Sequence, residues 1–190
     1  MDRTRRSILM ASLAYPLSIA TFAASAQGVG RPDGRTLVAF FSRSGSTRVV
    51  AGQISRSRGG DLFEIEPAKS YPQGYFETVE QARQERDSGY EPPLRSTVAS
   101  MAEYRTLFLC FPIWGETAPP VIRSFLSAHD LAEKIVVPAI LHGGYGLGTS
   151  LDVLRSHAPQ ARLVDGFALQ GPQERETAIK VKAWLDELKM

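Results

Sequence analysis

Residues 36–48, TLVAFFSRSGSTR, decide the fold of this chain. An apolar run at 37–41 is typical of a buried strand, a turn of small hydroxyl residues follows it, and a helix is predicted directly afterwards at 48–57. The first N–H groups of a helix have no partner within the helix and carry the positive end of its dipole, so this arrangement suits an anion. The favoured ligand is a phosphate group.

The turn supplies six candidate phosphate-binding residues. They are Ser42, Arg43, Ser44, Gly45, Ser46 and Thr47. The four hydroxyls add hydrogen-bond donors, and the glycine lets the backbone curl around an anion. The turn lacks the Gly-Lys-Ser/Thr of nucleoside-triphosphate loops, and no G-x-G-x-x-G follows the first strand. An ordinary helix-capping turn in an α/β domain remains the alternative.

Two later segments repeat the pattern of a buried strand that ends in a loop. Residues 104–110 (YRTLFLC) run into a loop with four candidate ligand-binding residues, Pro112, Ile113, Trp114 and Gly115. Residues 134–141 (KIVVPAIL) run into a second loop with five, His142, Gly143, Gly144, Tyr145 and Gly146. Open parallel sheets bind their ligands at the carboxyl ends of their strands. The three loops are therefore expected to form one site.

These loops resemble those of the flavodoxin family. The first matches the flavodoxin phosphate loop S/T-x-S/T-G-x-T, the P-x-W-G at 112–115 resembles the loop that sets an aromatic ring against the flavin, and 142–148 resembles the second flavin-side loop. The resemblance covers roughly residues 35–189. It implies an α/β three-layer sandwich with a five-stranded parallel sheet in the order 2-1-3-4-5, helices on both faces, and FMN as cofactor.

The resemblance also implies individual roles. The FMN phosphate would bind the first loop, mainly through neutral donors, and the flavin ring would lie between Trp114 and Tyr145. An exposed loop anchor is the alternative reading for either ring. In flavodoxins the peptide after the tryptophan turns over to accept a hydrogen bond from the reduced flavin, and Gly115 would permit the positive φ that this requires.

The other elements follow the same alternation of strand and helix. An edge strand is predicted at 61–66 and a helix at 75–86 with Tyr75, Phe76, Val79 and Ala82 at helical spacing. A helix with an apolar stripe is predicted to begin at Pro119 and Pro120, and a further helix, capped by Thr149 or Ser150, is predicted to run through 155. A fifth strand is predicted at 163–169 and a last helix at 174–188. Its predicted apolar face holds Ala178, Val181, Trp184, Leu185 and Leu188. The connection over 67–103 is the longest, and there are no repeats and no second domain.

The N-terminal part is predicted to be a leader. Residues 1–26 combine a basic start, an apolar stretch broken by Pro16 and a small-residue cleavage site, which is typical of a secretory signal peptide. The run TRRSIL also resembles the twin-arginine signal, whose substrates cross the membrane already folded. A general secretory leader and an uncleaved anchor are the alternatives. A linker then covers 27–35, the flavodoxin-like domain covers 36–190, and an exported, periplasmic location is expected.

Charge and composition exclude other classes. The chain has a net charge of +2, and without the leader its basic and acidic residues balance, with no basic stripe that would favour nucleic acid. Near-neutral charge departs from the strongly acidic electron carriers of the flavodoxin family and predicts weaker electrostatic docking. Cys110, the only cysteine, is expected to be buried, and His129, His142 and His157 lack metal-ligand spacing.

Two functions fit these observations best. The first is an exported FMN-binding electron-transfer protein with an unidentified redox partner or small electron acceptor. The second is an FMN-dependent NAD(P)H/quinone-type reductase, whose substrate pocket would lie between the Trp114 and Tyr145 loops and the 67–103 connection. A flavodoxin-like scaffold that has lost FMN and binds another anion is the third possibility. No catalytic residue, no metal site and no membrane span in the mature chain are predicted.

Overall fold

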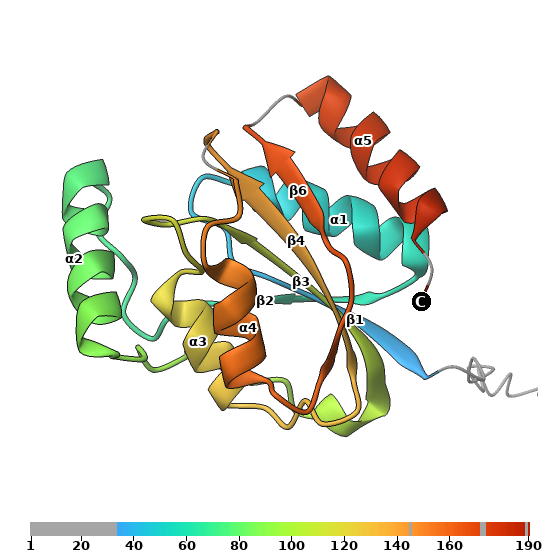
Figure 1. Cartoon of the computed structure of the whole chain (residues 1–190), viewed down its shortest axis with the longest axis horizontal. Coiled ribbons are helices and arrows are strands. Elements are labelled where there is room, and N and C mark those ends of the chain that lie inside the picture. Colours follow the sequence, from blue (N-terminus) through green and yellow to red (C-terminus); the bar gives the residue numbers. More distant parts are fainter. Residues whose placement is uncertain (1–33, 145, 172–173, 189) are drawn as a thin grey trace, which may run out of the picture.

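The sheet has the predicted strand order. The computed structural model describes residues 34–144, 146–171, 174–188 and 190, so the predicted leader and nearly all of the linker lie outside the described residues (Figure 1). The parallel strands follow the order β2-β1-β3-β4-β5, with β6 also paired to β4. Their bounds are β1 Arg35–Phe40, β2 Asp61–Glu64, β3 Tyr104–Pro112, β4 Ile135–His142, β5 Arg162–Leu163 and β6 Phe167–Gln170.

Helices cover both faces of this sheet, as Figure 1 shows. The helices α1 (Ser46–Arg58) and α5 (Glu174–Glu187) lie on one face, and α3 (Pro120–Ser127) and α4 (Ser150–His157) lie on the other. Successive side chains of a strand point to opposite faces, so Leu37 packs under α3 and α4 whereas Val38 packs under α1 and α5. Cys110 is buried as expected, and burial raises the pKa of its thiol. The α/β sandwich of the flavodoxin-like fold is therefore confirmed.

The predicted helices form, with shifted ends. The helix α1 begins at Ser46 rather than Arg48, because Gly45 takes the capping position in a left-handed conformation and its carbonyl accepts the first helical hydrogen bond, 3.2 Å from the Val49 nitrogen. The apolar stripe of α3 is buried as predicted. In α5, Trp184 packs on Phe167, but Ala178 is exposed and the buried position is that of Thr177.

The predicted fifth strand is split into β5 and β6. Both pair with β4, but the register advances by one residue between them. The break lies beside Pro138 of β4, which has no N–H to donate to a neighbouring strand. Gly166 sits so close to Pro138 that a Cβ would overlap its carbonyl oxygen and ring.

The 67–103 connection carries α2 (Tyr75–Ser88) and a short 3₁₀ turn, Met101–Glu103. The helix α2 stands apart from the sandwich, beyond α3 and near the carboxyl ends of the strands (Figure 1). Its apolar spacing does not lead to burial of the whole face, since only Ala82 of the four predicted apolar residues is buried. None of the described helices is long and apolar enough to cross a bilayer.

A histidine ties the end of this connection to α3. The Val98 N–H donates to His129 Nε2 at 2.9 Å, and His129 Nδ1 lies 2.7 Å from the Phe125 carbonyl. This pairing requires a neutral ring with its proton on Nδ1. Burial lowers the pKa of His129, which favours that neutral form.

Candidate functional site

The first predicted loop joins β1 to α1. Gly45 has φ +94, and its N–H donates to Ser42 Oγ at 3.1 Å, which closes the turn. The hydroxyls of Ser44 and Ser46 lie 3.4 Å apart at the helix end, and Thr47 is buried beneath them. The first turn of α1 has no acidic residue and no side-chain cap. A helix end without these groups is suited to an anion from outside the chain.

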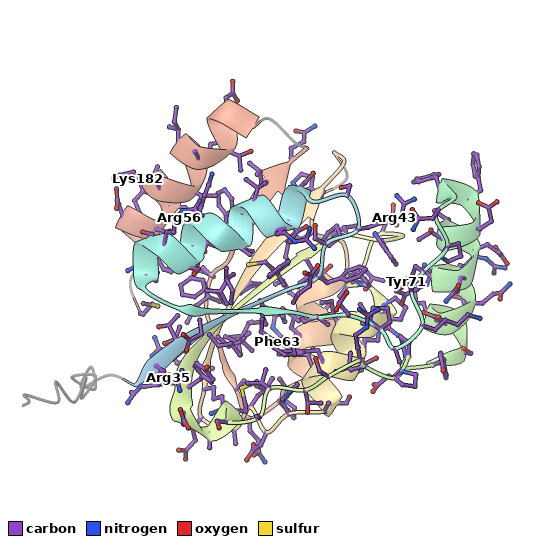
Figure 2. All side chains as sticks on the ribbon, turned by 180° about the vertical axis from the view of Figure 1, so that it is seen from behind. Arg35, Arg43, Arg56, Phe63, Tyr71 and Lys182 are labelled. Carbon is purple, nitrogen blue, oxygen red and sulfur yellow. The ribbon has the colours of Figure 1, made fainter. Side chains whose placement is uncertain are left out.

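The two arginines next to this loop have other contacts. Arg43 reaches toward α2 and donates to the Gln73 carbonyl at 2.8 Å, and Figure 2 shows it between the sheet and that helix. Arg48 pairs with Glu64 at the edge of the sheet. Both arginines therefore have partners outside the loop, and the binding of the phosphate mainly through neutral donors stays a prediction.

The second loop is a tight turn from Trp114 to Thr117. The Trp114 N–H donates to the Thr117 carbonyl at 3.0 Å, and the Thr117 N–H lies 3.4 Å from the Trp114 carbonyl oxygen. Gly115 and Glu116 between them have φ +56 and +63. Positive φ at both central residues defines a type I′ turn. Gly115 thus has the predicted positive φ, and Glu116 bears strain of about 1–2 kcal/mol.

The third loop braces this turn. The Thr149 N–H donates to the Glu116 carbonyl at 2.9 Å, and Thr149 Oγ1 lies 2.9 Å from Thr117 Oγ1. Gly148, with φ +50, packs so closely that a Cβ would lie 2.6 Å from the Glu116 carbonyl carbon. The Thr149 side chain therefore bonds to the neighbouring loop and does not cap α4. These contacts hold Glu116 in its strained conformation.

The start of the third loop is exposed and rich in glycine. The Gly144 N–H donates to His142 Nδ1 at 3.2 Å. Gly143 and Gly144 are exposed, and Gly146 has φ +75. Tyr145 lies outside the described residues, and its stacking on a flavin ring stays a prediction.

An aromatic cluster that sequence reasoning missed fixes Trp114. Phe41 and Tyr71 meet the indole edge-on, with centroids 5.1 and 4.8 Å away. The Tyr71 hydroxyl donates to Glu85 Oε2 of α2 at 2.8 Å, and both side chains are buried. Burial is the main cause that raises the pKa of Tyr71, and the hydrogen bond to Glu85 raises this pKa further. Edge-to-face pairs of this kind contribute about 0.5–1.5 kcal/mol each. The signal for Tyr71 was weak, because it lies in a proline-bounded loop.

A cavity of about 400 Å³ lies between α2 and the Trp114 turn. The predicted residues that it brings together are Arg43, Ile113, Trp114 and Gly115. A smaller hollow of about 230 Å³ joins Ser44, Gly45 and Ser46 to the end of β4. None of the described residues among 142–146 lines the larger cavity. Its second wall is α2, which belongs to the 67–103 connection that the reductase hypothesis assigned to the substrate pocket.

Comparison with known proteins identifies the family. A family model described as Flavodoxin matches residues 35–188. The chain belongs to the flavodoxin family. Flavoprotein structures from Bacteroides eggerthii and Bacteroides uniformis are 30% and 31% identical to it, with TM-scores of 0.70 and 0.71. The alignments cover 82% and 80% of this chain, and 99% and 98% of those proteins.

A more distant flavodoxin-fold structure carries a ligand. It is a flavoprotein from Lactobacillus acidophilus in complex with FMN, 14% identical, with a TM-score of 0.65 and coverage of 81% of this chain and 97% of its own. At this identity the likeness shows the fold alone. No curated protein matches the chain in a sequence comparison.

The first loop has the chemistry that a flavodoxin phosphate loop needs. Its donor set consists of hydroxyls and main-chain N–H groups, and the position where Gly45 lacks a Cβ has no atom within 4 Å. Neutral donors at a helix N-terminus suit a phosphate dianion. Across the described residues, no group of three His, Cys, Asp or Glu side chains could hold a metal ion.

Proposed function

We propose that this flavodoxin is an FMN-binding electron-transfer protein that works outside the cytoplasm. The observation that carries the proposal is the first loop, where serine hydroxyls lie at the N-terminus of α1 next to Gly45 in the left-handed conformation. The first turn of that helix has no acidic residue. Family membership and the FMN complex of the Lactobacillus flavoprotein support the same cofactor.

Each loop has a separate task in this proposal. Ser42, Ser44 and Ser46, with the first N–H groups of α1, hold the phosphate through charge-assisted hydrogen bonds. Trp114, fixed by Phe41 and Tyr71, supports the flavin ring. The bound FMN supplies the redox chemistry. The Gly115 peptide of the type I′ turn at 114–117 would lie beside it, and contacts from the third loop hold that turn.

Export is supported by the leader pattern of residues 1–26. A twin-arginine route suits a protein that folds around a cytoplasmic cofactor before it crosses the membrane. Near-neutral charge in the remaining chain also suits a role away from strongly basic partner proteins. Fractionation of cells expressing the full chain tests this, and a protein with an intact leader in the cytoplasmic fraction would contradict it.

The cavity beside Trp114 favours a second candidate, an FMN-dependent NAD(P)H/quinone-type reductase. An electron carrier needs no substrate pocket, whereas about 400 Å³ next to the expected flavin position can hold a small acceptor. The carrier remains the first proposal because no nicotinamide-binding site has been assigned among the described residues.

One purification tests both candidates. The protein recovered from the periplasm is expected to show flavin absorbance that dithionite bleaches, and the apoprotein is expected to take up FMN. Steady-state oxidation of NAD(P)H with a quinone would favour the reductase, and its absence would favour the carrier. A protein with no flavin bands and no FMN uptake would instead support the scaffold that binds another anion.

A further inference from the structure

We infer that the cavity between α2 and the Trp114 turn binds a small, flat aromatic molecule that carries an acidic group. The inference deepens the proposed function and rests on it, since this molecule would be the electron acceptor or donor next to the flavin. The cavity is defined by one wall from the Trp114 turn with Arg43 and one wall from α2. Its volume of about 400 Å³ is within the range of small-molecule sites.

The apolar part of the cavity suits a ring. Ile113 and Trp114 form one side, and Tyr75, Val79 and Ala82 of α2 form the other. Tyr75 and Val79 stay 66% and 46% exposed, although both are large apolar side chains. A flat ring between these walls would bury that surface, which is the main source of affinity for such ligands.

The charged part of the cavity is basic. Arg43, Arg83 and Arg86 line it, and among the described lining residues there is no acidic side chain. The carboxylates that pair with the α2 arginines, Glu80 and Asp87, lie outside the lining. Arg43 meets the neutral Gln73 carbonyl instead. Arg83 and Arg86 thus share their charge with carboxylates outside the lining, whereas Arg43 adds a charge that meets only a neutral carbonyl. The lining itself is cationic, which favours an anion.

Arg86 connects this charge to the redox site. A Cβ on Gly115 would lie 2.6 Å from Arg86 Nη1, so the guanidinium rests against the central peptide of the turn. The next residue toward the N-terminus, Glu85, is held by Tyr71 and thereby by the cluster around Trp114. Nε and Nη2 of Arg86 face Asp87 Oδ1 at 3.0 and 2.9 Å, so Nη1, on the side of the turn, is the atom left to donate to a carboxylate or sulfonate. The ring of the same molecule would then lie against Trp114.

Calorimetric titration of the FMN-loaded full chain tests the inference, with 2-naphthoate and the uncharged naphthalene-2-carboxamide as probes. We expect naphthoate to bind about tenfold more tightly than the amide, as a charged hydrogen bond would give. Arg86→Gln should reduce that ratio to about one, and Arg86→Lys should retain part of it. Arg155→Gln is the control, because Arg155, like Arg86, pairs with a carboxylate of its own helix but does not line the cavity.

Three results would overturn the inference. The probes bind equally well, or neither binds, or Arg86→Gln weakens FMN binding as much as naphthoate binding while naphthoate competes with FMN. The last result would assign the cavity to the cofactor itself. Failure of the proposed function is distinguishable, because the wild-type protein would then show no FMN uptake by absorbance before any probe is added. The titration of that apoprotein would still report on the cavity.

Discussion

Replacing Gly148 by alanine tests the brace between the Trp114 turn and the third loop. An alanine at φ +50 costs about 1–2 kcal/mol, and its Cβ would overlap the Glu116 carbonyl. Relief of that overlap breaks the hydrogen bond from Thr149, which adds about 1 kcal/mol. We expect the free energy of unfolding of the apoprotein to fall by at least about 2–3 kcal/mol in urea denaturation.

Two glycines of the same loop separate the contributions. Gly146 has φ +75 but no atom within 4 Å of its missing Cβ, so Gly146→Ala should cost only the backbone strain of about 1–2 kcal/mol. Gly143 has neither a positive φ nor a close neighbour, so Gly143→Ala should stay within about 0.5 kcal/mol of the wild type. Equal losses in all three variants, or a Gly148→Ala loss no larger than that of Gly146→Ala, would refute the brace.

Three further predictions concern other parts of the site and fold. Tyr71→Phe removes one hydrogen-bond donor from the buried carboxylate of Glu85 and should lower the free energy of unfolding by about 1–3 kcal/mol in urea denaturation. Tyr90→Phe, at an exposed position, should not lower it, and equal losses in the two variants would contradict the buried pairing. Because burial lowers the pKa of His129, the folded state keeps the ring neutral, so the contribution of His129 to stability should be complete above about pH 6.5 and should decline as the pH falls below it. His129→Gln should flatten the slope of stability against pH between about pH 5 and 7, and an unchanged slope would exclude His129 as its source. Ser44→Asp should weaken FMN binding at least about tenfold in a fluorescence titration, because the new carboxylate repels the phosphate. The stability of the apoprotein should be unchanged or higher, because an acidic side chain is favourable at the N-terminus of α1, and unchanged FMN affinity would place the phosphate elsewhere.

The sequence allowed most of the fold to be predicted, because its signals were local. Each buried strand is a continuous apolar run that ends at small or aromatic loop residues, and a parallel sheet brings those ends to one edge. The positive φ of Gly115 was predictable for the same reason, since the constraint lies within one turn. The boundary error at α1 came from Gly45, which had been assigned to the turn although its carbonyl already accepts a helical hydrogen bond.

The errors arose where distant residues decide the structure. Pro138 lies on the neighbouring strand β4, where the pairing of the fifth strand is interrupted, and no inspection of 163–169 could show this. The Tyr71–Glu85 bond links a loop to a helix, and neither residue lies in a recognisable motif. Thr177 takes the buried position predicted for Ala178, because small shifts in helix rotation are set by packing on the sheet.

The reductase hypothesis placed the 67–103 connection beside a pocket, but the sequence of α2 did not reveal that this helix stands apart from the sheet. Tyr75, Phe76 and Val79 at helical spacing are compatible with packing on the sheet, yet Phe76 is 82% exposed and the helix lines a cavity with the Trp114 turn instead. The buried carboxylate of Glu85 anchors one side of α2 through its hydrogen bond with Tyr71, and Arg83 and Arg86 of the same helix line the cavity beside the turn. An arginine-lined cavity next to the expected flavin position suits a small anionic molecule as the redox partner of this near-neutral chain, whether the protein acts as a carrier or as a reductase.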